Sequence, residues 1–116
     1  PGASLYVIPL VLRLTGSLQL THLDQSIQVI VRRHEILRTT FDIVDGQLVQ
    51  AIAPQLHVPL RLTDLRTLPA NSRENAALNQ IWQEIEQPFH LDKGSLLRVR
   101  LWQLQDTEHL LLIALH

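Results

Sequence analysis

Two residue types are absent from the 116-residue sequence, and glycine is scarce. The absence of cysteine excludes disulfide bonds, thiolate metal sites and a cysteine nucleophile. The absence of methionine leads us to expect that the start codon lies upstream, and that the chain is part of a longer protein. The four glycines, at positions 2, 16, 46 and 94, are scattered. They form neither a glycine-rich phosphate-binding loop nor a Gly-x-Ser-x-Gly nucleophile turn.

Charge is balanced and shows no concentration of one sign. The ten basic and eleven acidic residues give a net charge of −1 without a basic stripe, so we expect no nucleic-acid partner. The apolar start, residues 1–14, is too short and too interrupted for a membrane span and lacks the basic beginning of a signal peptide. We therefore expect a cytoplasmic protein with no membrane partner. A hydrophobic content of 46% is sufficient for one packed unit over residues 1–116.

The first third of the sequence changes from a two-residue to a helical period. Apolar residues alternate over residues 8–14, which predicts a strand. Thr21, followed by Asp24, is similar to a capping box and predicts the start of a helix. One apolar stripe runs along this helix and predicts that His34 lies on its buried side: Leu20, Leu23, Ile27, Ile30, Val31 and His34.

The middle of the sequence predicts a hairpin, a short strand and a second helix. Residues 39–43 alternate, and Asp45-Gly46 is a strong two-residue turn signal before a returning strand from Gln47 to Ile52. Residues 60–65 predict a further strand. A second helix is expected to begin at Asn71 and to end before a proline. Its predicted apolar face consists of Leu78, Ile81, Trp82 and Ile85.

The last segment predicts two strands, at residues 96–104 and 109–115. The second is apolar on both faces, so we expect it inside a sheet that is covered on both sides. Trp82 and Trp102 are interpreted as core or sheet packing. The resulting order, β-α-β-β-β-α-β-β, predicts an α/β layered domain whose sheet is incomplete within this chain.

Residues 31–46, "VRRHEILRTTFDIVDG", concentrate charge where the first helix passes into a strand. His34-Glu35-x-x-Arg38 differs from the zinc motif His-Glu-x-x-His because arginine does not ligate a cation, and we predict no metal site. For Arg33 and Arg38 the residues leave two interpretations open. Both arginines lie in solvent and complement the helix dipole, or at least one is buried and paired with a carboxylate.

The strings "RRHEILRTTF", "VDGQLVQAIAP" and "LLLIALH" together resemble the condensation domains of nonribosomal peptide synthetases. Those domains carry the motif Arg-His-Glu-x-Leu-Arg-Thr-x-Phe. This chain matches it at every specified position: Arg33, His34, Glu35, Leu37, Arg38, Thr39 and Phe41. Their next motif, His-His-x-x-x-Asp-Gly, follows an apolar strand, so His116 resembles its first histidine. The chain departs from the family at His90, where aspartate is more usual.

The resemblance covers essentially the whole chain and implies a fold similar to chloramphenicol acetyltransferase. The chain would be a segment of the first lobe, a two-layer α/β sandwich with an incomplete mixed sheet. It implies that His116 lies in the catalytic site and orients the active-site loop, whereas the catalytic second histidine is absent from this chain. It also implies that Arg33, with Arg38 as the alternative, braces that loop by pairing with an aspartate of the following motif.

The resemblance further implies amide-bond formation between aminoacyl or peptidyl thioesters. These groups arrive on the phosphopantetheine arms of carrier domains, so no cofactor is bound directly, and an adenylation domain is the expected neighbour. The chain alone is predicted to be inactive. Two alternatives stay open: a stand-alone acyltransferase of the same superfamily that uses coenzyme A or a carrier as donor, and a non-catalytic docking module.

Overall fold

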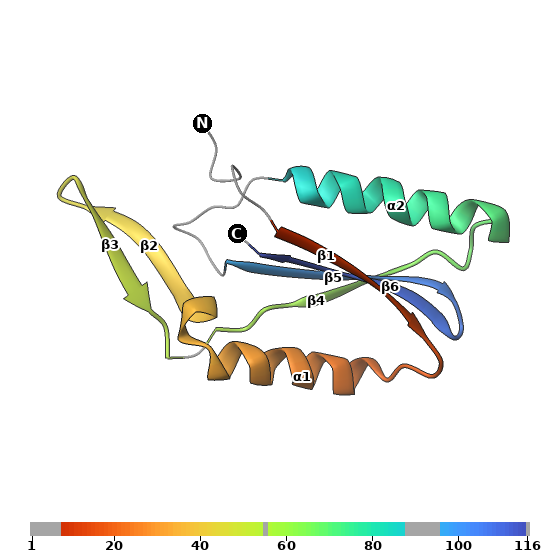
Figure 1. The fold of residues 1–116 in the computed structure, drawn as a ribbon, viewed down its shortest axis with the longest axis horizontal. Helices are drawn as coiled ribbons and strands as arrows, with labels where there is room; N and C mark the ends of the chain where they lie inside the picture. Colours follow the sequence, from red (N-terminus) through yellow and green to blue (C-terminus); the bar gives the residue numbers. More distant parts are fainter. Residues whose placement is uncertain (1–7, 55, 88–95, 116) are drawn as a thin grey trace.

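The structure is a computed structural model that describes residues 8–54, 56–87 and 96–115 (Figure 1). Within these residues, four strands form one mixed sheet in the order β1-β6-β5-β4. β1 and β5 both pair antiparallel with β6, and β4 pairs parallel with β5. The strands of this sheet are β1 (Ile8–Thr15), β4 (Leu60–Asp64), β5 (Leu97–Gln105) and β6 (Glu108–Leu115).

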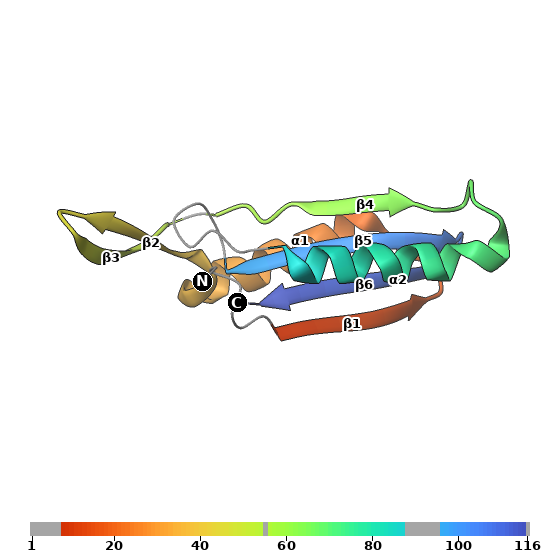
Figure 2. The same cartoon turned by 90° about the horizontal axis from the view of Figure 1, so that it is seen from above.

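One helix covers each face of the sheet, so the described part of the chain has three layers (Figure 1, Figure 2). α1 (Leu20–Arg33) lies on one face and α2 (Ala70–Glu86) on the other. The predicted two-layer arrangement is therefore wrong, whereas the predicted interior place of β6 is confirmed. The physical reason is that β6 is apolar on both faces, and each face needs its own cover. Neither described helix is long and apolar enough to cross a membrane.

The alternation of side chains along β5 and β6 divides the core in two. Odd-numbered residues of these strands join the α1-face core, which consists of Ile27, Val31, Leu37, Val58, Leu97, Val99, Leu101 and Leu111. Even-numbered residues join the α2-face core, which consists of Leu65, Ala77, Ile81, Trp102, Leu104, Leu110 and Leu112. Trp102 is fully buried, which confirms its predicted packing role.

α1 begins and ends differently from the prediction. It begins at Leu20, and Gln19, rather than Thr21, is the residue before it, without a side-chain cap in the described structure. Ile27 and Val31 are buried, but His34 is exposed, so its predicted burial is wrong. The helix ends at Arg33 and His34 has an extended backbone, so the helical spacing that placed His34 on the buried side no longer applies there.

α2 presents only part of the predicted face to the sheet. Ile81 is buried and Ile85 packs against the α2-face core, as predicted, whereas Leu78 is exposed. The helix begins at Ala70 after Pro69, and its buried residues are Ala77 and Ile81. Trp82 is 64% exposed, so its predicted packing role is wrong. Ala77 lies in the same core as Trp102, and its small side chain lets the helix approach that bulky ring.

β2 (Thr39–Val44) and β3 (Gln47–Ile52) form a separate two-stranded ribbon. Asp45 and Gly46 both have positive φ, of 53° and 77°, as a type I′ turn requires. The predicted hairpin is thus confirmed, with the predicted bounds for its second strand. The ribbon extends away from one end of the sheet, beyond the end of α1 (Figure 1).

Candidate functional site

The motif from Arg33 to Phe41 forms the junction between α1 and the ribbon. A short 3-10 helix, η1 (Glu35–Arg38), lies between them. The His34 N–H donates to the Ile30 carbonyl at 3.2 Å, and the Leu37 N–H donates to the His34 carbonyl at 3.0 Å. These bonds turn the chain through a compact corner, which ends where β2 begins at Thr39.

Arg38 connects the two sides of this corner. Its Nε donates to the Val31 carbonyl at 3.3 Å, and its Nη1 donates to the Ala53 carbonyl. The Ala53 N–H in turn donates to the Arg38 carbonyl at 2.9 Å. The half-buried guanidinium thus fastens the last turn of α1 to the residue that follows β3. We call this set of contacts the Arg38 clip.

Thr39 and Leu37 anchor the same corner in the core. Thr39 is only 3% exposed, and its Oγ1 donates to the Glu35 carbonyl at 2.9 Å. Leu37 is buried in the α1-face core together with Leu97, and Leu115 packs against that core. The corner is therefore joined by apolar contacts to the end of β6, because Leu97 and Leu115 are paired residues of β5 and β6.

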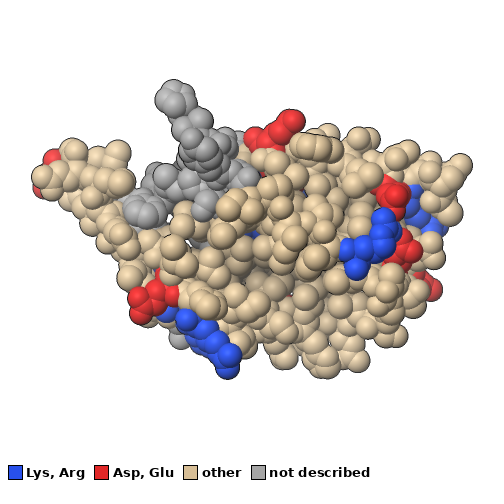
Figure 3. Space-filling model, viewed as in Figure 1, with Lys and Arg blue, Asp and Glu red and all other residues tan. Residues whose placement is uncertain are grey.

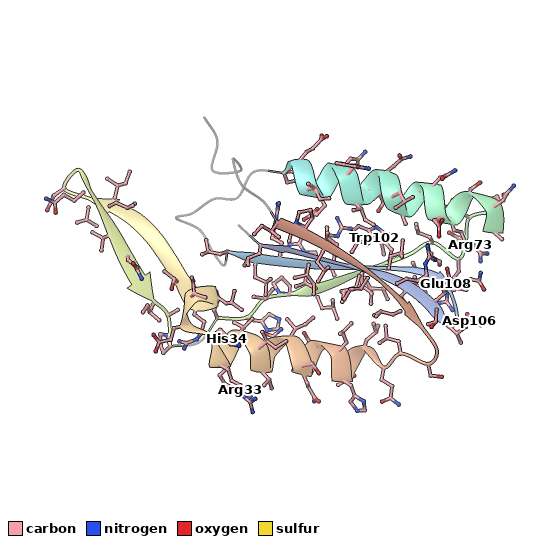
Figure 4. The ribbon with its side chains drawn as sticks, viewed as in Figure 1. Arg33, His34, Arg73, Trp102, Asp106 and Glu108 are labelled. Carbon is pink, nitrogen blue, oxygen red and sulfur yellow. The ribbon has the colours of Figure 1, made fainter. Side chains whose placement is uncertain are left out.

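The remaining motif residues are exposed, or their side chains are outside the described part of the chain. Arg33, His34 and Glu35 are exposed, and Arg33 points away from the sheet at the end of α1 (Figure 4). The two arginines whose burial the sequence left open therefore differ: Arg33 faces solvent and Arg38 is half-buried. Phe41 is paired with Gln50 in the ribbon, but its side chain is outside the described part. His116 also lies outside the described residues.

The motif and the strand before His116 meet at one end of the molecule. α1 ends, and β6 ends, at the end of the sheet from which the ribbon extends (Figure 1). The register agrees, since Leu115 is opposite Ile8 in β1 and Leu97 in β5. The end of α1 and the end of β6, which are far apart in the sequence, thus lie at the same end of the fold.

A polar cluster on the α2 face was not predicted from the sequence. Glu84 lies 3.2 Å from Arg100 and 3.9 Å from Arg98, and all three side chains are mostly buried. Arg98 also donates to the Glu84 and Gln87 carbonyls, at 3.1 and 2.9 Å, and burial lowers its pKa. The sequence signal was the alternation Arg98-x-Arg100, which puts both side chains on one face of a strand.

Trp102 completes this cluster beneath α2 (Figure 4). Its Nε1 donates to the Gln80 side chain at 2.8 Å, and the Arg100 guanidinium lies 5.0 Å from the ring centre. Arg100 also donates to Thr63 at 3.0 Å. These contacts connect β4, β5 and α2, so the cluster is a structural clamp at the C-terminal part of α2. Among residues 8–54, 56–87 and 96–115, no group of three acidic or histidine side chains is arranged to hold a metal ion.

Comparison with known proteins identifies the family. The model of the condensation domain family matches residues 1–116. The chain is 43% identical over 116 residues to a linear gramicidin synthase protein of Brevibacillus parabrevis, covering all of this chain and 2% of that protein. It is 41% identical over 115 residues to phosphinothricin tripeptide synthetase PhsB of Streptomyces viridochromogenes, covering 99% of this chain and 10% of that protein.

A solved structure gives the same result. The first condensation domain of the calcium-dependent antibiotic synthetase, in complex with a substrate analogue, is similar with a TM-score of 0.82 at 25% identity. The match covers 99% of this chain and 28% of that chain. The chain thus spans a small part of each of these relatives, and it belongs to the condensation domain family.

Proposed function

We propose that this chain is the first-lobe segment of a condensation domain in a nonribosomal peptide synthetase, with a fold of the chloramphenicol-acetyltransferase-like superfamily. The reaction is amide-bond formation between two carrier-bound thioesters. The acceptor amine attacks the donor thioester carbonyl, the C–N bond forms and the C–S bond breaks. The donor arm leaves as a thiol, and the amine loses a proton.

One observation carries this proposal. The family motif forms a hydrogen-bonded corner at the same end of the fold at which β6 ends, one residue before His116. In our proposal, His116 orients the active-site loop that follows it. Arg38 braces the corner from inside, because its Nε and Nη1 already bind carbonyls within this chain. Arg33 is exposed within these residues, and in our proposal its guanidinium pairs with a carboxylate of the following motif.

The proposed partners follow from the two thioesters. Phosphopantetheine arms of carrier domains deliver the donor and the acceptor, and an adenylation domain is a neighbour in the same cytoplasmic synthetase. The chain itself holds no cofactor in this reaction. Without the second histidine and the other lobe, residues 1–116 alone form no amide bond in our proposal.

The test uses the parent condensation domain with donor-loaded and acceptor-loaded carrier proteins. We expect a peptide one residue longer than the donor. His116→Ala should lower the rate by about tenfold to a hundredfold through lost orientation, with little change in melting temperature. Product from acyl-coenzyme A without carriers would favour a stand-alone acyltransferase. No product from any donor, with the fold intact, would favour a docking module.

A further inference from the structure

One face of the β2–β3 ribbon is aliphatic and exposed. The register pairs Ile43 with Leu48 and Thr39 with Ile52, and the side chains of paired residues lie on the same face. Ile43 and Leu48 are 70% and 69% exposed, and Ile52 is 48% exposed. We call these three side chains the apolar ribbon face. The ribbon that carries them extends beyond the end of the sheet (Figure 1).

The direction of the ribbon is fixed at its base, although its outer part is exposed. The Arg38 clip holds both strands of the ribbon to α1, and Thr39 is bonded to the Glu35 carbonyl. An isolated two-stranded hairpin is marginally stable in water, and a further packing surface is needed to order it. A ribbon that is anchored in one direction and carries large aliphatic side chains is suited to packing against such a surface.

The chemistry of the ribbon restricts what can cover it. By register, the described side chains on this face are all uncharged: Thr39, Ile43, Leu48, Gln50 and Ile52. Among the described atoms of the ribbon that Figure 3 shows, charge is confined to acidic atoms at its tip. Apolar protein surface complements such a face, whereas an acidic partner or a phosphate group gains no counter-charge from it.

The source of that surface follows from the extent of the family. The chain covers 28% of the solved condensation-domain chain and superposes on it over 99% of its own length, the ribbon included. The rest of such a domain is joined covalently to the ribbon and is present at a high effective concentration. We infer that the apolar ribbon face is covered by a segment of the same condensation domain outside these 116 residues. This inference rests on the proposed function for the identity of the parent protein.

Hydrogen exchange of the amides of β2 and β3 tests the inference in the parent synthetase and in its excised condensation domain. We expect slow exchange in both proteins, to the same extent and at every protein concentration. The double variant Ile43→Thr/Leu48→Thr should exchange at least about tenfold faster in the ribbon and should melt about 5 °C lower or more. The matched control is Val44→Thr/Val49→Thr, two exposed positions on the opposite face of the same ribbon. It should melt within about 2 °C of wild type.

Each other outcome overturns the inference in a different way. Protection that is lost when the condensation domain is excised identifies a carrier or adenylation domain as the cover. Protection that rises with protein concentration identifies a second copy. Fast exchange in the wild type, or equal effects of the two double variants, removes the apolar ribbon face as a docking surface. None of these measurements uses amide-bond formation, so a parent that protects the ribbon but forms no peptide contradicts only the proposed function.

Discussion

The two helices are held on the sheet by different kinds of contact. α1 relies on apolar packing, with Ile27 and Val31 buried in the α1-face core. One amide adds to it: Gln28 donates to the Val58 carbonyl at 2.7 Å and accepts from the Val58 N–H at 3.3 Å. The side chain of Gln28 thereby connects α1 to the segment that leads into β4 without placing a charge in the interior.

α2 has a narrower apolar face and is held by arginines near both ends. Ala77 and Ile81 are its buried residues. Near its start, Arg13 of β1 pairs with Glu74 of the helix and with Glu108 of β6. Near its end, Glu84 pairs with Arg98 and Arg100 of β5.

Arg73 adds a third attachment near the start of α2. Its guanidinium donates to the Leu68, Leu104 and Arg66 carbonyls at 2.9 to 3.0 Å. It lies at the end of the molecule opposite the ribbon, close to Asp106 and Glu108 in the view of Figure 4.

The difference shows how a helix with little apolar surface is still fixed in position. A fully buried leucine-sized side chain contributes about 1.5–3 kcal/mol, and α2 has only one such residue, Ile81, in its core. Charge-assisted hydrogen bonds from arginines of the sheet fix the orientation of α2. The small side chain of Ala77 does not fix it. The exposed Arg13 pairs contribute little because water screens them, so the buried Glu84 cluster carries more of this effect.

The largest expected effect is on the α2 face, at Trp102. Trp102→Ala should lower the free energy of unfolding by about 3–5 kcal/mol, because a fully buried ring is replaced by a cavity. Trp82→Ala is the matched control and should change it by about 0.5 kcal/mol or less, since Trp82 is exposed. Urea unfolding followed by circular dichroism measures both. Equal losses would show that Trp82 is packed in the core, as the sequence predicted.

A smaller loss is expected at Glu84. Glu84→Gln removes the carboxylate that two mostly buried guanidiniums share, and should cost about 1–3 kcal/mol. Glu86→Gln, an exposed position in the same helical turn, should be nearly neutral. The Glu84 effect should persist in high salt because water is largely excluded from the pair. If high salt abolished the loss of stability in Glu84→Gln, the cluster would lie in solvent. The proposed difference between the attachments of α1 and α2 would then be wrong.

The junction at the end of α1 provides the third comparison. In this chain, Arg38→Ala should cost about 1–2 kcal/mol by releasing the Val31 and Ala53 carbonyls, whereas Arg33→Ala should be nearly neutral. In the parent domain, Arg33→Ala should cost about 3–5 kcal/mol if Arg33 is buried against the carboxylate of the next motif. Melting curves of the two variants in both proteins measure this. Unchanged melting with lost activity would show that the arginines act on substrate or carrier.

The sequence predicted features that depend on neighbouring residues. It did not predict contacts between elements that are distant in the sequence. Asp45-Gly46 determined the hairpin because the turn is local and requires positive φ at both residues. His34 was misplaced because a helical stripe does not mark where the helix ends. Trp82 was misplaced because neighbouring stripes on one helix fit the same period, and only packing against the sheet selects between them. The pairing of Glu84 with Arg98 depends on a register between distant elements, which local pattern does not specify.

The smallest expected effect concerns His109, a buried polar residue on the α1 face of the sheet. His109 is 4% exposed and shares a sheet face with Leu14, its partner in β1. Within the described residues its Nδ1 has no hydrogen-bond partner. Burial lowers the pKa of His109, the Arg66 charge lowers it further, and Asp64 opposes them.

The pKa shift of His109 predicts a loss of stability in mild acid. The unfolded chain binds a proton as pH falls through about 6.5, whereas folded His109 binds it only at lower pH. The free energy of unfolding should therefore be unaffected by this group above that value. It should decrease as pH falls from about 6.5 toward the folded pKa. Urea midpoints between about pH 7.5 and 5.5 should shift less in His109→Leu than in wild type. The other described histidines, His22, His34 and His57, are exposed. If wild type and His109→Leu showed the same pH dependence, groups other than the buried imidazole of His109 would cause the loss of stability.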